Sequence, residues 1–409
     1  MLVSTLDHSS YVGRIAIGRI ERGQVRVGQR VALLDFGSPG MVDDVTGAEE
    51  AKVAKLYTFS GLERIEVDEA NAGDIVALTG IEGVEIGKTL SDPEHQERLL
   101  GIAVEEPTLS MDFSVNNSPF AGQSGKFVTT RHLRERLYRE LEQNVALRVE
   151  DTAQPETLTV SGRGELHLSI LIETMRREGY EFQVSRPRVI TRTGVDGGLQ
   201  EPYEEALIEV PSEIVGTVIE KLGSRKGEMT DLRPMGDSGT TRLSFRVPAR
   251  GLVGYRSEFL TDTRGEGVLH HQFHSWGPWA GVLTGRGRGV LVADRVGRAV
   301  GFALQNLQER GTLFVAPGEE VYGGMIVGEN ARTGDLDVNV GKEKKLTNMR
   351  AAGSDESIKL EPPRKITLEM ALEFIEDDEL LEITPDAIRL RKTVLDQNMR
   401  KKAAKRAKG

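Results

Sequence analysis

The 409-residue sequence predicts a multidomain α+β protein, and three observations carry this prediction. Residues 1–97 contain short apolar runs broken by glycines, which is typical of a β-barrel. Residues 98–190 (the first module) and 200–278 (the second module) each show the order strand, helix, strand, strand, helix, strand. Residues 279–409 (the C-terminal module) fit neither pattern and indicate a further α/β domain. A chain of this length can bury several separate cores.

The barrel is predicted from the first strands of the chain. Residues 12–19 are typical of a strand, and a turn at Glu21-Arg22-Gly23 follows. The next strand is expected over residues 24–34. Short strands with frequent turns favour a barrel over an open, helix-covered sheet.

The most informative stretch, residues 161–190, predicts a strand end, a tight Gly162-Arg163-Gly164 turn, a helix and a second strand. The helix begins at Glu165, and Gly179 stands where a C-terminal cap belongs. Its apolar residues recur at helical spacing, and they are Leu168, Leu171, Ile172 and Met175. Residues 180–184 then alternate, which predicts a half-buried strand.

The other elements of both modules follow from the same patterns. In the first module we expect strands at 109–115, 147–149 and 157–160, and a helix marked by Leu133, Leu137 and Leu141. In the second we expect strands at 204–210, 228–232, 242–247 and 267–273, and helices at 212–222 and around 254–261. This split βαβ order is the ferredoxin-like pattern. Between the modules, Asp196-Gly197-Gly198 predicts a hairpin or linker over residues 193–200.

The C-terminal module is predicted to hold buried strands at 289–293 and 299–304. A polar stretch follows at 333–357, and then a helix at 368–375 that Thr367 caps. The chain closes with nine Lys or Arg residues against one acid, Asp396; they occupy positions 389, 391, 392, 400, 401, 402, 405, 406 and 408.

Composition excludes several classes of protein. With 53 basic and 63 acidic residues the net charge is −10, so nucleic-acid binding would need locally concentrated positive charge. Cysteine is absent, which excludes disulfides and thiolate metal sites and fits a reducing cytoplasm. No apolar run approaches the ~20 residues of a membrane span, and Asp7 and His8 interrupt any signal peptide. We therefore expect a cytoplasmic chain with no membrane partner.

No catalytic, nucleotide or metal site is predicted. Gly87-Lys88-Thr89 has the ending of a P-loop, but Glu82 stands where its first glycine is required and would repel phosphate. The D-x-x-G matches at Asp44 and Asp262 are too short to be specific, and no Asn-Lys dipeptide exists. In a strand, the side chains of His270-His271-x-x-His274 point to both faces, so they cannot converge on one metal.

Two segments concentrate positive charge. The tail can neutralise RNA phosphates, and its candidate residues are Arg400, Lys401, Lys402, Lys405 and Arg406. The alternative for the tail is a disordered, solubilising segment. The polar segment 341–353 combines cations with directional hydrogen-bonding groups, and its candidates are Lys342, Lys344, Lys345, Thr347, Asn348 and Arg350. Such a long polar stretch inside a compact domain is usually functional or disordered, and we expect it to contact RNA.

Several segments resemble ribosomal translation GTPases, and within them the BipA/TypA family. The shared segments are residues 12–35, 161–168, 176–179, 185–187 and 248–261. A C-terminal signature is similar to BipA/TypA alone, and it comprises residues 309–311, 345–350 and 371–375. Elongation factor G and LepA share the barrel and both ferredoxin-like modules but not that C-terminal domain, so a fragment of either is the lesser alternative.

The resemblance implies a domain order. It comprises a translation-factor β-barrel like domain II (1–97), a ferredoxin-like third domain (98–190), a ferredoxin-like fifth domain (200–278) and a family-specific α/β C-terminal domain with a basic tail (279–409). In the family a GTPase domain precedes the barrel, whereas here the barrel begins at residue 1. GTP and Mg²⁺ are therefore expected only with that domain, and we expect no cofactor and no GTP hydrolysis in this chain.

The resemblance also implies partners. The family binds ribosomes in stress adaptation or large-subunit assembly, in the bacterial cytoplasm or the plastid stroma. The loop with Lys344, Lys345, Asn348 and Arg350 would reach ribosomal RNA and the acceptor end of A-site tRNA. Arg256 and Arg264 of the fifth-domain helix would meet large-subunit RNA, and the chain is expected to be a monomer. The interval 276–289 is short and rich in Gly and Arg for this family, which puts contacts there in question.

Two other classes of function remain open from the residues. An interaction scaffold, or a ligand-sensing regulator built on paired ferredoxin-like modules, would use apolar faces between modules. An RNA hydrolase or transferase would need a nucleophile, a metal cluster or a phosphate loop, and none is found. We interpret the carboxylate run at residues 376–379 as a solvated loop or helix end, and His167 as a structural histidine.

Overall fold

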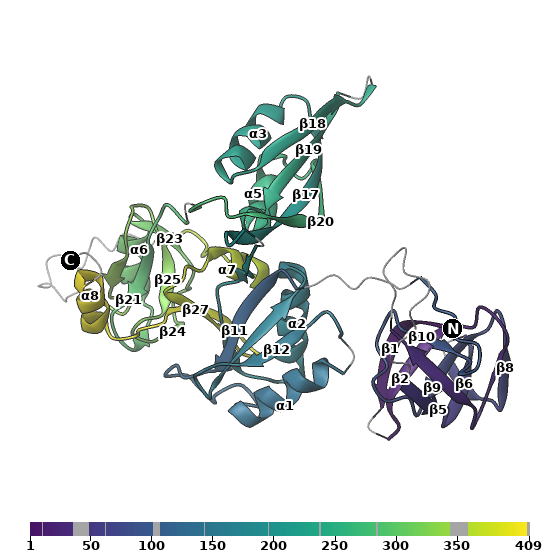
Figure 1. The fold of residues 1–409 in the computed structure, drawn as a ribbon. Helices are drawn as coiled ribbons and strands as arrows, with labels where there is room; N and C mark the ends of the chain where they lie inside the picture. Colours follow the sequence, from purple (N-terminus) through teal and green to yellow (C-terminus); the bar gives the residue numbers. More distant parts are fainter. Residues whose placement is uncertain are drawn as a thin grey trace, which may run out of the picture. The chain divides into compact units, whose positions relative to one another are not determined.

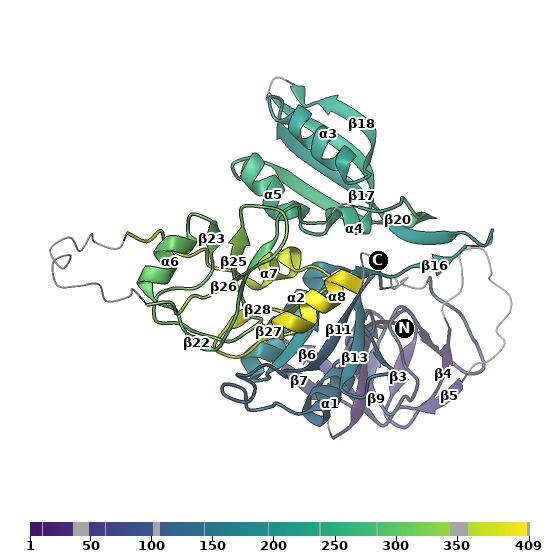
Figure 2. The ribbon, with the colours of Figure 1, turned by 90° about the vertical axis from the view of Figure 1, so that its left-hand side faces the viewer.

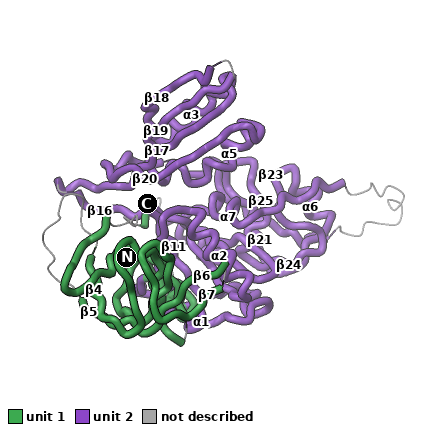
Figure 3. The backbone as a smooth tube through the Cα atoms, turned by 90° about the vertical axis from the view of Figure 1, so that its right-hand side faces the viewer, with its two compact units in different colours: residues 1–107, 134–149 green, residues 108–133, 150–409 purple. Residues whose placement is uncertain are grey.

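The computed structural model describes residues 1–409 apart from 10, 36–48, 62, 101–106, 143, 195, 237–238, 284, 344–358 and 407–409. The chain divides into two compact units, which Figure 3 colours separately. Unit 1 consists of Met1–Pro107 and Arg134–Val149, and unit 2 of Thr108–Leu133 and Glu150–Gly409. Figure 1 labels the helices and strands of both units. Among the residues described, no helix is long and apolar enough to cross a membrane.

Unit 1 is built on an eight-stranded antiparallel sheet and a two-stranded ribbon. The sheet has the order β5-β4-β10-β1-β2-β9-β6-β7. Its strands are β1 (Leu2–Ser9), β2 (Gly13–Arg19), β4 (Arg30–Leu34), β5 (Glu49–Lys52), β6 (Lys55–Ser60), β7 (Glu63–Glu66), β9 (Ile75–Thr79) and β10 (Thr89–Ser91). The ribbon pairs β3 (Gln24–Arg26) with β8 (Glu69–Asn71). Both contribute to one buried core that includes Val3, Val25, Leu56 and Val76, so the strand-rich character predicted here is confirmed.

The prediction of a single strand over residues 24–34 is wrong. The segment forms β3 and β4, which belong to different sheets. A turn separates them, in which Gly28 has φ 83° and the Gln29 N–H donates to the Arg26 carbonyl at 3.2 Å. Because glycine adopts this left-handed conformation without a steric penalty, the chain turns between two runs that both have strand character.

The largest sheet of unit 2 joins segments that are far apart in the sequence (Figures 1 and 2). Its order is β12-β13-β11-β14-β27-β28, and β15 also pairs with β11. The strands are β11 (Leu109–Val115), β12 (Arg148–Asp151), β13 (Thr157–Gly162), β14 (Phe182–Ser185), β15 (Arg188–Val189), β27 (Glu379–Ile383) and β28 (Ile388–Lys392). The last two, which the sequence analysis assigns to the C-terminal module, therefore extend the sheet of the first module.

The helices of the first module begin and end close to where the sequence predicts. Helix α2 (Glu165–Glu178) buries the four apolar residues that predicted it. Gly179 ends α2 with φ 96°, and its N–H donates to the Arg176 carbonyl at 3.1 Å. Helix α1 (Thr130–Glu140) buries Leu133 and Leu137 and ends before Leu141.

Strand β14 is not half-buried, so this part of the prediction is wrong. All four of its residues are buried, including Gln183 and Ser185. The strand lies between β11 and β27, which pair along both of its edges. The Gln183 amide donates to Ser114 Oγ at 3.0 Å, and the Asp112 N–H donates to Ser185 Oγ at 2.9 Å. These bonds give the Gln183 amide nitrogen and the Ser185 hydroxyl partners inside the sheet, whereas Gln183 Oε1 has no hydrogen-bond partner among the described residues.

The second module contains an antiparallel sheet with the order β16-β17-β19-β18, and β20 pairs with β17. Its strands are β16 (Arg192–Thr193), β17 (Leu199–Pro211), β18 (Glu228–Pro234), β19 (Thr240–Pro248) and β20 (Val268–Pro278). The helices are α3 (Val215–Ser224), α4 (Ala249–Leu252) and α5 (Tyr255–Asp262). Val218 of α3, Phe245 of β19 and Phe259 of α5 belong to one buried core, and Figure 1 labels these three elements. The hairpin predicted at residues 193–200 is confirmed, because β16 pairs with β17 through it.

The C-terminal module has a four-stranded sheet with the order β23-β25-β21-β26 and a ribbon of β22 and β24. The strands are β21 (Val290–Ala293), β22 (Gly297–Arg298), β23 (Gly311–Leu313), β24 (Glu320–Val321), β25 (Ile326–Asn330) and β26 (Leu336–Val338). The helices are α6 (Gly301–Leu307), α7 (Leu368–Phe374) and α8 (Gln397–Arg406). Thr367 caps α7 as predicted, since its hydroxyl accepts from the Met370 N–H at 3.3 Å.

The strand predicted at residues 299–304 is wrong. These residues lead into helix α6, which buries Ala303, Leu304 and Leu307 on one face. A short apolar run does not by itself distinguish a buried strand from a buried helix, and the packing of α6 against the C-terminal core decides between them here.

Candidate nucleic-acid interface

The basic tail forms a capped helix, α8. The Asp396 carboxylate accepts from the Met399 N–H at 2.8 Å, and the Asp396 carbonyl accepts from the Arg400 N–H at 3.0 Å. Asp396 therefore satisfies donors at the start of the helix, as an N-cap does. The alternative of a disordered tail is wrong for residues 397–406.

Arg400 anchors this helix to the sheet of the C-terminal module. Its guanidinium donates to the carbonyl oxygens of Val394 at 3.0 Å and Leu395 at 2.6 Å, and it pairs with Asp337 on β26. The side chains of Arg400 and Asp337 are only 16% and 20% exposed. Lys401 lies 3.8 Å from the same carboxylate. Two of the five predicted tail residues thus lie against an acid, and Arg400 holds the helix in place.

The other tail candidates are exposed on α8. Lys402, Lys405 and Arg406 have no ion-pair partner among the residues that the structure describes. No acid lies within Gln397–Arg406, and two of the bases occupy the last turn, where the helix dipole favours cations. A fixed helix that carries unneutralised cations is suited to a phosphate backbone.

The second predicted segment is described only at its start. Lys342 is exposed shortly after β26. Lys344, Lys345, Thr347, Asn348 and Arg350 lie outside the described residues.

In the second module, Arg256 is exposed on α5, and Arg264 is exposed directly after the helix ends. Arg264 has φ 52°, the left-handed conformation that disfavours residues with a Cβ atom. The only other non-glycine residue with positive φ in the described chain is Lys226, at φ 66°, directly after α3. Such a conformation costs about 1 kcal/mol for a residue other than glycine.

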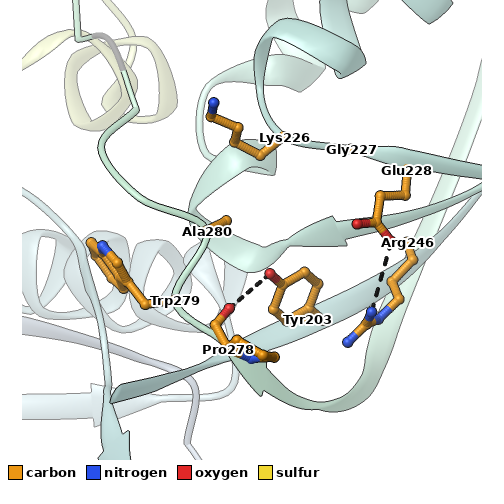
Figure 4. A pocket seen from close by; sticks show the side chains of 8 residues that line it. All are labelled: Tyr203, Lys226, Gly227, Glu228, Arg246, Pro278, Trp279 and Ala280. Carbon is orange, nitrogen blue, oxygen red and sulfur yellow. Dashed lines mark hydrogen bonds and ion pairs between the residues drawn. The ribbon is translucent and has the colours of Figure 1, made fainter. Parts of the chain in front are cut away.

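Sequence reasoning missed Lys226. Its signal in the sequence is a basic residue immediately before a glycine at a helix end, in Lys226-Gly227 and again in Arg264-Gly265. Lys226 and Gly227 line a pocket of about 490 Å³ together with Tyr203, Glu228, Arg246, Pro278, Trp279 and Ala280 (Figure 4). The pocket lies where the end of β20 and the start of β18 approach β17 and β19.

The motifs that resembled a phosphate loop or a metal site in the sequence have structural roles. Lys88 donates to the Gly83 carbonyl at 3.2 Å and pairs with Asp35, and Thr89 begins a strand rather than a helix. His271 pairs with Glu204, and this hydrogen bond raises the pKa of His271. His167 Nδ1 accepts from the Arg163 N–H at 3.3 Å. Among the described residues, no group of His, Cys, Asp or Glu could hold a metal ion.

A buried carboxyl group lies where α2, α5 and α7 approach one another. Burial, and to a lesser extent the nearby Glu373 carboxylate, raise the pKa of Glu165 to about 7, while the hydrogen bond from the Gly254 N–H acts in the opposite direction. One of its carboxyl oxygens is buried without a hydrogen-bond partner in the described chain. Burial also raises the pKa of Glu373.

Three family models match the chain. The TypA/BipA C-terminal domain matches residues 288–397, the elongation factor G C-terminus matches 198–286, and elongation factor Tu domain 2 matches 13–91. None of these three models describes a GTPase domain.

Similar proteins are called "Large ribosomal subunit assembly factor BipA". The protein of Bacillus subtilis strain 168 is 50% identical over 407 residues, which is 99% of this chain and 65% of that protein. The Synechocystis sp. protein is 52% identical over 404 residues, with 99% and 65% covered, and the Escherichia coli K12 protein is 51% identical over 404 residues, with 98% and 65% covered. The chain thus spans 65% of the length of these relatives. A solved structure from Thermus thermophilus aligns with a TM-score of 0.42 and 16% identity over 68% of this chain and 55% of that one, which carries no argument.

The matched domains define the chain as part of a translation factor. It belongs to the BipA/TypA family, and its matches include the domain that carries that family's name.

Proposed function

We propose that this chain is the ribosome-binding part of a BipA/TypA factor that acts in large-subunit assembly or stress adaptation. The names of the relatives support a role at the large subunit. In this proposal the C-terminal module contacts ribosomal RNA and the acceptor end of A-site tRNA, and the chain acts as a monomer in the bacterial cytoplasm or plastid stroma. GTP and Mg²⁺ would belong to the GTPase domain that the family carries before the barrel.

The four-domain division is part of this proposal, with boundaries at residues 1–97, 98–190, 200–278 and 279–409. The strand order supports two ferredoxin-like modules. Taking the strands of each module in chain order, both sheets run 4-1-3-2, as β14-β11-β13-β12 and β20-β17-β19-β18. This is the order that a split βαβ fold produces.

The observation that carries the proposal is the anchored basic helix. The chain has a net charge of −10, so a cationic surface has to be concentrated and held in place to attract RNA. Arg400 and Asp337 fix α8, and Lys402, Lys405 and Arg406 remain available. Binding of this kind reads phosphates and shape rather than base sequence.

Co-sedimentation with purified ribosomes and separate large subunits, across a salt series, tests the proposal. The expected result is saturable binding that falls steeply with salt, because each neutralised phosphate releases counterions. The triple variant Lys402→Ala, Lys405→Ala, Arg406→Ala should weaken binding and flatten the salt dependence. If the triple variant, made in the whole 409-residue chain, binds ribosomes with unchanged affinity, α8 is not part of the interface.

A matched control removes the same charge where it is already neutralised. Arg22, Arg26 and Arg30 are exposed in unit 1, and each pairs with a glutamate. Their triple alanine variant should keep most of the affinity. Binding that does not respond to salt would instead favour the interaction scaffold, because contacts between apolar protein faces are not weakened by counterions.

A further inference from the structure

In the second module, helices α3 and α5 are each followed by a non-glycine residue with positive φ, Lys226 and Arg264. The two helix ends share one hydrogen-bond pattern. After α3, the Gly227 N–H donates to the Leu222 carbonyl at 2.7 Å and the Lys226 N–H to the Gly223 carbonyl at 3.0 Å. After α5, the Gly265 N–H donates to the Leu260 carbonyl at 2.8 Å and the Arg264 N–H to the Thr261 carbonyl at 3.2 Å. This pair of bonds defines a Schellman motif, whose left-handed residue is usually glycine.

Helix α2 of the same chain ends in a Schellman motif with the usual glycine at the left-handed position. The Tyr180 N–H donates to the Met175 carbonyl and the Gly179 N–H to the Arg176 carbonyl, both at 3.1 Å, so Gly179 occupies the left-handed position. The second module places Lys226 and Arg264 at the equivalent positions instead. Within the described chain neither cation has an ion-pair partner, so no ion pair there offsets the strain. Backbone strain that persists in this way is a signature of functional sites.

The pocket beside Lys226 supplies the second observation. The Arg246 guanidinium lies 4.3 Å from the centre of the Tyr203 ring and 3.8 Å from Glu228 Oε2. Figure 4 shows the Tyr203 hydroxyl engaged with the Pro278 carbonyl, and that distance is 2.9 Å. Figure 4 also shows the Lys226 side chain at the rim of the pocket with no interaction drawn to it. Lys226 thus lines a pocket that also contains a planar guanidinium, an aromatic ring and a carboxylate.

We infer that this pocket binds one unpaired nucleotide of RNA, with its phosphate at Lys226 and its base against Arg246. Guanidinium planes and aromatic rings stack on bases without sequence preference, and the Glu228 carboxylate accepts from an exocyclic amino group. The bases of an A-form helix lie in a groove that side chains cannot read, so the nucleotide has to come from a loop, bulge or strand end. The inference rests on the proposed ribosomal RNA binding and identifies one subsite within it.

The test compares Lys226→Gly with Lys226→Arg in the full chain. Lys226→Gly relieves the left-handed strain, so we expect its melting temperature to rise by a few degrees. We expect its affinity for a fluorescent 12-nucleotide single-stranded RNA, measured by anisotropy at low salt, to fall about five-fold, with a salt slope smaller by about one. Lys226→Arg keeps the charge and should bind as the unchanged chain does. Arg246→Gln should also weaken single-stranded RNA binding, whereas binding of a duplex RNA should change little in every variant.

The outcomes separate this inference from the proposed function. Ribosome co-sedimentation that depends on α8, together with a Lys226→Gly variant that binds single-stranded RNA undiminished, would overturn the subsite and leave the proposed function standing. If Lys226→Gly lowers stability and leaves binding unchanged, the role of Lys226 is to stabilise the C-terminal end of α3 by its positive charge. That result would also overturn the subsite. Loss of affinity in a folded Lys226→Gly variant supports it.

Discussion

Arg286 and Glu379 form a two-pronged ion pair, with Nη2 to Oε1 at 2.8 Å and Nη1 to Oε2 at 3.1 Å, and the Glu379 side chain is fully buried. Arg286 also donates to the Phe374 carbonyl at 2.7 Å and lies 4.1 Å from the centre of the Phe374 ring. Arg286 belongs to the interval 276–289, whose length and composition made contacts there questionable. The ion pair links this interval to β27, which begins at Glu379 and extends the sheet of the first module.

The first prediction concerns this pair. Arg286→Ala leaves the buried Glu379 carboxylate with two partners: Lys392, whose Nζ lies 2.9 Å from Oε1, and the Glu376 N–H, which donates to Oε2 at 3.0 Å. Removing one partner of a buried ion pair should destabilise unit 2 by about 3 kcal/mol, because the remaining charge is poorly compensated. Urea denaturation followed by tryptophan fluorescence measures the change. Arg288→Ala is the control, since Arg288 is 64% exposed and 3.8 Å from Glu329, and its loss should cost at most about 1 kcal/mol. Equal effects in both variants would contradict a special role for Arg286.

The second prediction concerns the anchor of α8. Asp337→Asn removes the carboxylate that pairs with Arg400, and we expect α8 to lose about 2 kcal/mol of local stability. Amide hydrogen exchange of residues 397–406 should become faster while exchange in β21 stays slow. Asp294→Asn is the matched change, because Asp294 pairs with the exposed, adjacent Arg295. Unchanged exchange in α8 after Asp337→Asn would mean that the two carbonyl contacts of Arg400 suffice.

The elements that the sequence predicted well are those with a local signal. Helix α2 has a helical apolar pattern and a glycine cap, and α7 has Thr367 as a cap; both begin within a residue of expectation. The candidate RNA-binding residues of α8 could be named from the sequence because their charges cluster along the chain, and their contact with RNA stays a prediction. For the interval 376–379, the solvated interpretation holds for Asp377, which is 78% exposed, and fails for Glu379.

The elements that the sequence missed depend on distant partners. The sequence near Phe182 gives no sign that β27, which lies far along the chain, pairs with the second edge of β14 and makes it an inner strand of the sheet. The apolar run before Leu304 has no period long enough to separate a strand from a helix. Lys226 was missed because its significance lies in a backbone conformation, and the residue type alone does not reveal a positive φ.

The third prediction concerns the polar segment after β26. Lys344→Ala, Lys345→Ala and Arg350→Ala together should lower ribosome affinity at moderate salt, because each cation that neutralises a phosphate adds to binding, and we expect the melting temperature to stay unchanged. Co-sedimentation and thermal denaturation on the same samples measure both effects. Lys359→Ala with Lys365→Ala removes exposed positive charge just beyond the segment and serves as the comparison. Undiminished affinity in the triple variant, with an intact melting temperature, would exclude the segment from the interface.

The fourth prediction concerns the pH dependence that Glu165 imposes on stability. In the folded chain the pKa of Glu165 is about 7, against an ordinary value of 4.5, because burial and the Glu373 carboxylate disfavour its charged form. The groups that face it are Glu373 and Glu369 on α7, His271 on β20 and the Gly254 N–H. Between pH 4.5 and 7 the folded state therefore holds a proton that the unfolded state releases. Stability should fall as pH rises through this window, by at most about 3 kcal/mol.

Glu165→Gln should remove most of this slope, because a neutral amide has no proton to release. The variant should match the unchanged chain near pH 5 and exceed it in urea midpoint near pH 8. The raised pKa of His271 acts in the same direction but at higher pH, since its stabilising charge is present below pH 6.5 and is lost as pH rises through its folded value. His271→Gln should therefore leave the slope between pH 5 and 6.5 in place. An unchanged slope in Glu165→Gln would show that Glu165 is ionised in the folded chain and that its neighbours compensate its charge.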